Sequence, residues 1–167
     1  PHNLADIQLK NRVVMAPMTR TRTLNDVADE LVALYYSQRA SAGLIITEGL
    51  PVSEEGRGYL YTPGLYNEAQ MHGWRKVTDA VHAKGGRIFA QLWHVGRMSH
   101  VSVLPENQAP VSSGTIPATN TTVFAYSDSG EPSAVTPSIP RALETEEVKR
   151  VTKDFVKSAR LAIEAGF

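Results

Sequence analysis

The sequence predicts an α/β fold in which parallel β-strands alternate with α-helices. Three apolar runs, at residues 12–16, 44–47 and 87–92, have the length of strands. They are almost continuously apolar, as strands are when both faces of a parallel sheet are covered. Amphipathic helical patterns lie between and after them, which is the order expected for right-handed strand–helix crossovers. Three such strands alone would leave both edges open, so the pattern indicates part of a closed (β/α) barrel.

Three helices are expected, over residues 29–42, 67–84 and 145–165. Each carries apolar residues at the three- and four-residue spacing that places side chains on one face of a helix. Asn67 is a suitable N-cap for the second helix. The predicted apolar stripes are Leu31, Leu34, Tyr35 and Ala42 in the first helix, Met71, Trp74, Val77 and Val81 in the second, and Val148, Val151, Phe155, Ala159 and Ala162 in the third.

Residues 96–143 form a segment that is too long for an ordinary connection and is rich in Pro, Ser, Thr, Asn and Gly. Loops of this length in compact domains usually have a function of their own. Within the segment, Asp128-Ser129-Gly130 is a turn sequence that indicates a small hairpin. We therefore expect an excursion, with short strands of its own, between the third strand and the third helix.

Composition and charge exclude several classes of protein. Seventeen basic residues balance seventeen acidic ones, so no electrostatic footprint indicates nucleic acid or a membrane surface as a partner. The absence of cysteine excludes disulfides, thiolate metal sites and a cysteine nucleophile. The first residues lack the basic and apolar regions of a signal peptide, and no apolar run approaches the roughly twenty residues of a membrane span. We expect a cytoplasmic protein, and the sequence leaves its oligomeric state open.

The residues at the end of each predicted strand are small or form hydrogen bonds, and in a (β/α) barrel they would meet at one edge. Pro17, Met18 and Thr19 follow the first strand, Gly49 follows the second, and Gln91 lies at the end of the third. A proline ends ladder pairing, a glycine lets a flat ligand approach the backbone, and an amide offers a donor beside an acceptor. This set favours a planar heterocycle with alternating donors and acceptors on its edge.

Five stretches of the sequence are similar to one known family. They are LKNRVVMAPMTR, YYSQRASAGLIITEG, GYLYTPGL, GGRIFAQLWHVGRMSH and IPRALETEEV. In this order, over nearly the whole chain, they resemble the Old Yellow Enzyme family of flavin-dependent ene-reductases. The resemblance implies a (β/α)8 TIM barrel that binds FMN non-covalently. It also implies an oxidoreductase that passes a hydride from NAD(P)H through FMN to activated alkenes such as enones, maleimides and nitro compounds.

On this resemblance, residues 1–167 are the N-terminal part of a single FMN-binding barrel domain. They supply roughly the first three β/α units, with the excursion of residues 96–143 after the third strand. The family's substrate-activating His with His or Asn, and its proton-donating Tyr, match positions beyond Phe167, so no catalytic residue is expected within this chain. A complementary C-terminal half of the barrel is then needed, together with a small-molecule substrate.

The resemblance also implies roles for individual residues. Pro17, Met18 and Thr19 line the flavin, with the Thr19 Oγ near the C4 carbonyl of the ring. A hydrogen-bond donor there stabilises negative charge on the reduced ring and raises its potential. The Gly49 backbone meets the flavin edge, and Gln91 pairs with the pyrimidine side of the ring.

Tyr59 and Trp93 match positions near the substrate face of the family. An aromatic ring there stacks on the substrate or limits its size, although packing alone would also explain either ring. One alternative is a catalytically incomplete partial barrel, or half of a split protein, that acts only with a complementary segment. Another is a different barrel enzyme, such as a metal-dependent lyase or aldolase that uses His94 and Glu48. No second carboxylate accompanies this pair, so we expect no metal.

Overall fold

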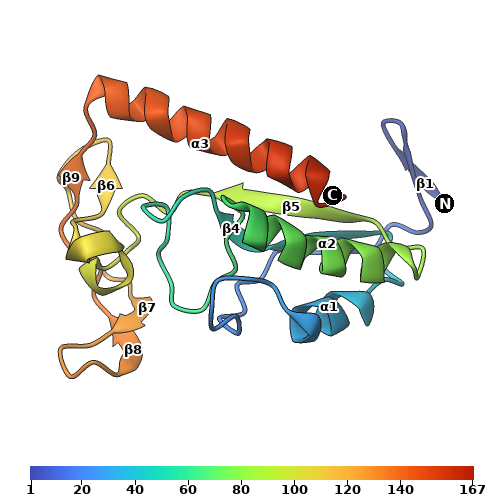
Figure 1. The fold of residues 1–167 in the computed structure, drawn as a ribbon, viewed down its shortest axis with the longest axis horizontal. Coiled ribbons are helices and arrows are strands. Elements are labelled where there is room, and N and C mark those ends of the chain that lie inside the picture. The colour runs from blue at the N-terminus through green and yellow to red at the C-terminus, as the bar shows by residue number, and fades with distance from the viewer.

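Three parallel strands form the central sheet of the computed structural model, which describes residues 1–167, in the order β3–β4–β5. They are β3 (Val14–Met15), β4 (Leu44–Pro51) and β5 (Ile88–Trp93). Helix α1 (Glu30–Ser37) follows β3, α2 (Glu68–His82) follows β4, and α3 (Thr145–Glu164) follows β5 after a long excursion. The elements have the predicted strand–helix order and form three β/α units of an open sheet that does not close into a barrel (Figure 1).

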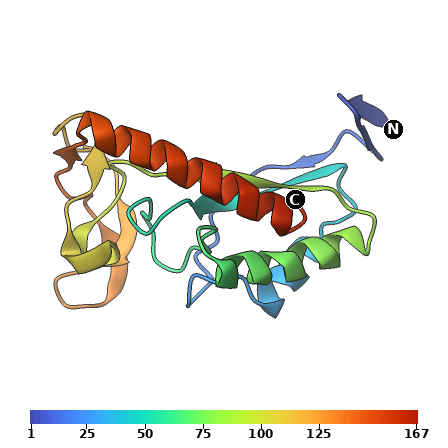
Figure 2. The ribbon, with the colours of Figure 1, turned by 45° about the horizontal axis from the view of Figure 1, so that its top comes forward.

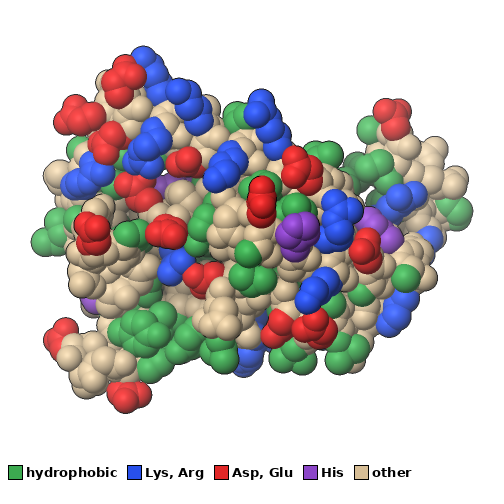
Figure 3. Space-filling view, viewed as in Figure 1, with side chains coloured by type: hydrophobic (Ala, Val, Ile, Leu, Met, Phe, Trp, Pro, Cys, Tyr) green, Lys and Arg blue, Asp and Glu red, His purple; other side chains and the backbone are tan.

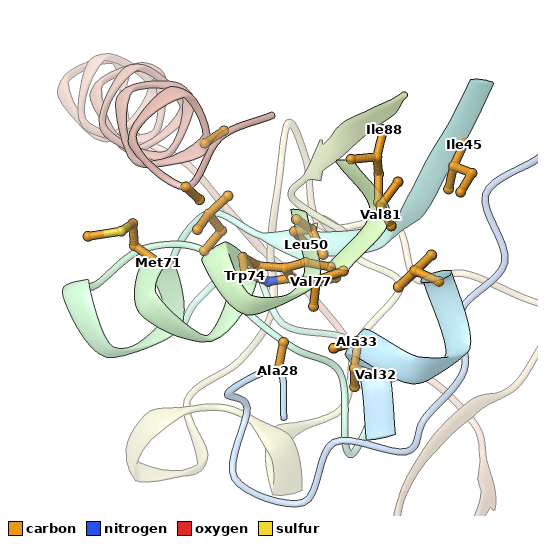
Figure 4. Close-up of a cluster of buried hydrophobic side chains, with 14 of the residues drawn as sticks. Ala28, Val32, Ala33, Ile45, Leu50, Met71, Trp74, Val77, Val81 and Ile88 are labelled. Atoms are coloured by element: carbon orange, nitrogen blue, oxygen red, sulfur yellow. The ribbon is translucent and has the colours of Figure 1, made fainter. Parts of the chain in front are cut away.

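The main core lies between one face of the sheet and the helices, with the C-terminal end of α3 beside it (Figure 4). Helix α2 begins where the sequence predicts, because the Asn67 side chain accepts a hydrogen bond from the Gln70 N–H at 2.9 Å. Its predicted apolar stripe is buried in this core and consists of Met71, Trp74, Val77 and Val81. The prediction for this helix is therefore confirmed in both its start and its buried face.

For α1 the predicted face is wrong at two of its four residues. Leu31 is 61% exposed and Leu34 is 50% exposed, whereas Tyr36 is fully buried. The reason is tertiary, because the helix turns Val32, Ala33 and Tyr36 into the main core, and the Tyr36 hydroxyl there donates a hydrogen bond to Glu48 of β4 at 3.2 Å. The helix is also shorter than predicted and ends at Ser37.

The predicted inward face of α3 is correct only near its C-terminal end. Ala162 is buried as predicted, beside Ser158 and Leu161, whereas Val148 is 50% exposed and Ala159 also faces solvent. All fully buried side chains of α3 lie in its C-terminal half. The N-terminal half extends past the end of β5 toward the excursion, so it has no sheet to pack on (Figure 1). Figure 3 shows basic and acidic side chains of α3 along the upper edge of the molecule.

Two small sheets and two 3-10 turns make up the excursion between β5 and α3. Strand β6 (Val111–Ser112) pairs in parallel with β9 (Arg141–Ala142), and β7 (Val123–Tyr126) forms an antiparallel hairpin with β8 (Pro132–Val135). The turns are η1 (Val101–Val103) and η2 (Pro105–Asn107). A second, smaller core joins these elements to the β4–α2 connection and consists of Leu60, Val103, Leu104, Val123 and Ala125.

A hairpin of β1 (His2–Leu4) and β2 (Ile7–Leu9), which the sequence reasoning did not identify, lies at the other end of the sheet from the excursion (Figure 2). Directly after it, the Lys10 ammonium group donates to the backbone carbonyls of Ala40 and Gly85. Both carbonyls lie just beyond the C-terminal ends of helices, where a cation is favourable. None of the helices is both long enough and apolar enough to cross a membrane.

Candidate functional site

The carboxyl ends of β3, β4 and β5 meet at one edge of the sheet, next to the excursion (Figure 1). At this edge Gly49 of β4 and Gln91 of β5 are register partners in neighbouring strands. Gln91 is partly buried, and its backbone N–H donates to the Thr47 Oγ1 at 3.0 Å. The ladder therefore uses the backbone of Gln91, and its side-chain amide stays available to a ligand.

Pro17, Met18 and Thr19 follow β3 as an exposed, irregular segment. One residue further on, the Arg20 N–H donates to the Glu48 carboxylate at 3.2 Å. Because Glu48 immediately precedes Gly49 in β4, this hydrogen bond brings the segment to the edge at which Gly49 and Gln91 pair. Predicted positions from all three strands therefore come to one edge.

Strand β4 continues past its predicted end at Thr47, as far as Pro51, because of a β-bulge. The register with β5 shifts just before Gly49. The Thr47 hydroxyl fills the gap in the ladder, since it accepts a backbone N–H of β5 and donates to the Glu48 carbonyl at 2.7 Å. A bulge inserts one extra residue and bends the strand. As a result, the Glu48 side chain faces α1, whereas Gly49 faces the opposite side of the sheet.

Trp93 is the last residue of β5, and its indole lies against Gly49. A Cβ at position 49 would lie 2.3 Å from the Trp93 Cδ2, so no larger residue fits unless the ring moves. Tyr59, from the β4–α2 connection, stacks on the same indole with ring centroids 6.0 Å apart and planes at 19°. The glycine that we expected to admit a flat ligand thus admits the flat side chain of Trp93. The two predicted substrate-facing residues form one aromatic stack at this edge.

The Trp93 Nε1–H is buried and has no hydrogen-bond partner within the chain. A buried donor without a partner is uncommon and costs about 1–3 kcal/mol. This donor therefore indicates an acceptor that comes from outside the chain. Together with the Gln91 amide and the Thr19 hydroxyl, it gives the edge a set of donors that fits the carbonyl oxygens and ring nitrogens of a planar heterocycle.

Glu48 is the buried acid of this edge and is only 2% exposed. The Tyr36 hydroxyl donates to its carboxylate at 3.2 Å and accepts its backbone N–H at 2.8 Å. Burial raises the pKa of the Glu48 carboxyl above its ordinary value. We considered Glu48 only as a metal ligand, although an acid inside the apolar run LIITEGL is itself a sign of a buried anchor.

His94, the other residue of the metal-dependent alternative, has different partners. Its Nδ1 accepts the Gly96 N–H at 3.1 Å, and its Nε2 lies 3.9 Å from the Glu55 carboxylate. Burial lowers the pKa of His94 below its ordinary value. No three side chains of metal-binding type gather in the structure.

Sequence reasoning missed Glu55, which connects three parts of the molecule. Its carboxylate lies 2.7 Å from a guanidinium nitrogen of Arg150 in α3 and 3.5 Å from one of Arg141 in β9. Arg141 in turn binds both carboxylate oxygens of Glu147, at 2.7 and 2.8 Å. These four residues, called here the Glu55 cluster, join the β4–α2 connection, the end of the excursion and the start of α3. Glu55 lies 95 residues from Arg150, too far in sequence for a local pattern to group it with the other three.

Comparison with known proteins places the chain in a family. Residues 1–167 match the model of the NADH:flavin oxidoreductase / NADH oxidase family over their full length. Together with the three β/α units and the edge described above, this match shows that the chain belongs to that family. It is the Old Yellow Enzyme family that the sequence motifs resemble, so that prediction is confirmed.

Individual relatives agree with this assignment. The structure of morphinone reductase in complex with tetrahydroNAD has a TM-score of 0.94 and 48% identity, and the match covers 97% of this chain and 45% of that one. The old yellow enzyme homologue from Zymomonas mobilis has a TM-score of 0.88 and 42% identity, and the match covers 97% of this chain and 44% of that one. A curated relative, 12-oxophytodienoate reductase 1 of Oryza sativa subsp. japonica, is 42% identical over 168 residues, which cover 100% of this chain and 42% of the relative. The chain thus spans less than half the length of these relatives.

Proposed function

We propose that this chain is the N-terminal part of an FMN-dependent oxidoreductase that reduces activated alkenes with NAD(P)H. Membership of a flavin oxidoreductase family over residues 1–167 supports the flavin, and a relative solved with tetrahydroNAD supports a nicotinamide donor. Enones, maleimides and nitro compounds are the substrate classes that we expect. The observation that carries the proposal is the pairing of Gly49 with Gln91 at the edge to which the Arg20–Glu48 hydrogen bond ties the segment that contains Thr19.

The residues of this edge would hold the flat ring of FMN. Bound FMN would supply the hydride chemistry, by accepting a hydride from NAD(P)H and passing it to the alkene. Pro17 and Met18 would line the ring, and the Thr19 hydroxyl would donate to a ring carbonyl and stabilise negative charge there. The Gln91 amide would pair with the donor–acceptor edge of the ring, and the Gly49 backbone would meet its rim.

The stacked rings of Tyr59 and Trp93 would form a wall of the substrate space. Their planes are nearly parallel, at 19°, so together they present aromatic surface on which a conjugated substrate can stack. The Trp93 Nε1–H, which has no partner within the chain, would donate to an acceptor on the cofactor or the substrate. We therefore assign these two residues to the substrate side of the site.

The apolar faces that the structure leaves open fit the remainder of a (β/α)8 barrel. Val14 and Phe89 are exposed on the sheet, away from the main core. Leu31 and Leu34 of α1 line a cavity of about 310 Å³ together with Glu48. Apolar surface of this kind requires a covering partner. We propose that a complementary C-terminal half of the barrel covers it and supplies the family's His with His or Asn and its Tyr.

Colour tests the proposal on a full-length protein that contains this chain. We expect a yellow protein with bound FMN that bleaches when NADPH is added without oxygen and regains its colour when an enone is added. The same cycle with a saturated ketone in place of the enone should leave the protein bleached. A colourless protein that takes up no added FMN would contradict the proposal.

A second candidate function concerns the chain by itself. Exposed apolar side chains on the sheet and on α1 favour an incomplete half barrel that is inert until a complementary segment binds. This candidate is compatible with the first, since the complete protein can be an enzyme while residues 1–167 alone have no activity. Size-exclusion chromatography and circular dichroism of the isolated chain test this second candidate.

A further inference from the structure

The segment between β3 and Thr23 is joined to the sheet at a single backbone point. After Met15, the next backbone hydrogen bond from this segment to the sheet is the one from the Arg20 N–H to the Glu48 carboxylate, at 3.2 Å. The segment is fixed again at Thr23, whose N–H donates to the Tyr61 carbonyl at 3.0 Å. Glu48 therefore supplies the side chain that fixes the middle of this segment.

The position of Glu48 in β4 is itself fixed from two sides. Its carboxylate and its backbone N–H both bind the Tyr36 hydroxyl, at 3.2 and 2.8 Å. Its backbone carbonyl accepts the Thr47 hydroxyl of the bulge at 2.7 Å. A carboxylate held in this way has few alternative rotamers, so the distance from β4 to the Arg20 N–H is fixed as well.

The hydrogen bond joins Arg20 to Glu48, and each of these two residues is adjacent in sequence to a proposed cofactor contact. Thr19 immediately precedes Arg20, and Gly49 immediately follows Glu48. The Arg20 guanidinium also lies over the Tyr35 ring, 4.9 Å from its centroid, which fixes the side chain of the same residue on α1. Thr19 itself is exposed, and no side-chain hydrogen bond of its own holds it in place.

We propose that Glu48 is a positioning residue that sets the place of the Thr19 hydroxyl at the cofactor edge by accepting the Arg20 N–H. This inference rests on the proposed function and goes beyond it, because it assigns a role to an acid whose side chain faces α1, on the opposite face of the sheet from Gly49. The role requires an acceptor of the right length at position 48. It does not require a charge, because the groups that bind the carboxylate are neutral donors.

A double-mutant cycle on the full-length FMN protein tests this role. The variants are Thr19→Ala, Glu48→Ala and the two combined. The readouts are the FMN dissociation constant of the apoprotein, the flavin midpoint potential and the rate of flavin reduction by NADPH. We expect Thr19→Ala and Glu48→Ala each to lower the rate about 10-fold, the effect of one lost hydrogen bond to a charged group. In the Thr19→Ala background, Glu48→Ala should change the rate by less than about 2-fold.

Two further variants separate length from charge. Glu48→Gln keeps an acceptor oxygen at the same distance, so it should retain the potential and the rate of the unmodified protein. Glu48→Asp keeps the charge but shortens the side chain, so it should behave like Glu48→Ala. It also replaces Glu48→Ala in the cycle if that variant does not fold.

Tyr36→Phe removes the hydroxyl that holds the Glu48 carboxylate from α1 and leaves the bond to Arg20 in place. It should lower the melting temperature of the apoprotein and shift the midpoint potential in the same direction as Glu48→Ala, but by less. Additive effects of Glu48→Ala and Thr19→Ala, or a loss with Glu48→Gln equal to that with Glu48→Ala, would overturn the inference. If Thr19→Ala itself leaves potential and FMN affinity unchanged, the assignment of Thr19 under the proposed function fails instead.

Discussion

At the scale of single residues, Gly49 and Trp93 are fitted to each other. The indole occupies the space that any side chain at position 49 would need. Packing of the Trp93 indole therefore requires glycine at this position, whether or not a ligand binds. The same contact holds the indole at the cofactor edge, where its N–H has no partner.

Gly49→Ala should destabilise the apoprotein, because its Cβ would lie 2.3 Å from the Trp93 Cδ2 and the ring would have to move. We expect a loss of about 1–3 kcal/mol in the free energy of unfolding, as for other overpacked sites. Urea denaturation followed by circular dichroism measures it. Gly114→Ala is the matched control, since a Cβ there meets nothing within 4 Å. Equal stability of the two variants would show that the Trp93 ring moves away from a Cβ at position 49 without loss of free energy of unfolding.

At the scale of elements, the match between prediction and structure depends on how many partners an element has. Helix α2 packs on both the sheet and α1, so a broad face is buried and its 3.6-residue pattern is clear in the sequence. Helix α1 is only eight residues long, and packing of Val32, Ala33 and Tyr36 in the main core decides which face turns inward. The Glu55 cluster shows the same dependence, because it joins three elements through side chains alone.

Glu55→Gln should loosen the end of the excursion, since it removes the charge that holds Arg141 and Arg150. Partly exposed ion pairs contribute about 0.2–1 kcal/mol each, so we expect faster amide hydrogen exchange in β6 and β9 and little change in α2. Hydrogen exchange read by mass spectrometry measures this difference. Glu54→Gln, the adjacent acid without an ion pair, serves as the control. Unchanged exchange in β9 would show that backbone pairing alone holds the excursion.

The start of α3 should respond to acid through Glu147. Its hydrogen bonds with the Arg141 guanidinium and the Glu144 N–H lower the pKa of Glu147 from 4.5 to about 2. A lowered carboxyl pKa stabilises the folded state fully above 4.5, and this stabilisation is lost as the pH falls toward 2. We expect the carboxyl ¹³C signal of Glu147 to titrate well below that of an ordinary glutamate. Arg141→Ala should move it toward the ordinary range, because Arg141 is the largest cause of the shift, whereas Lys149→Ala, which removes the exposed partner of Glu146, should leave it in place.

At the scale of the whole molecule, the open sheet sets what residues 1–167 can do by themselves. The central sheet has three strands, so both of its edges are unpaired. One face carries the main core, and the other exposes Val14 and Phe89. A sheet with unpaired edge strands and an uncovered apolar face associates readily with other chains.

The isolated chain of residues 1–167 should therefore self-associate and should not bind FMN. We expect size-exclusion chromatography to give species larger than a monomer of 18.2 kDa, and circular dichroism to give a broad thermal transition. Addition of the separately expressed C-terminal segment of the full-length protein should restore a single species with FMN absorbance. A monomer with a sharp transition and bound FMN, in the absence of that segment, would show that this half is complete in itself.

The sequence by itself determined the order of strands and helices, and the cap and buried face of α2. These features depend on spacing within one element, so they can be read from neighbouring residues. The family also followed from the motifs, whereas the assignment of Thr19, Gly49 and Gln91 to the flavin stays a prediction.

Only the tertiary structure decided the buried faces of α1 and α3, the bulge in β4, the fit of Trp93 to Gly49 and the links made by Glu48 and Glu55. Each of these depends on contacts between distant parts of the chain, such as Glu55 with Arg150, 95 residues apart. Local propensity carries no information about such contacts, because they form only when the sheet brings the elements together.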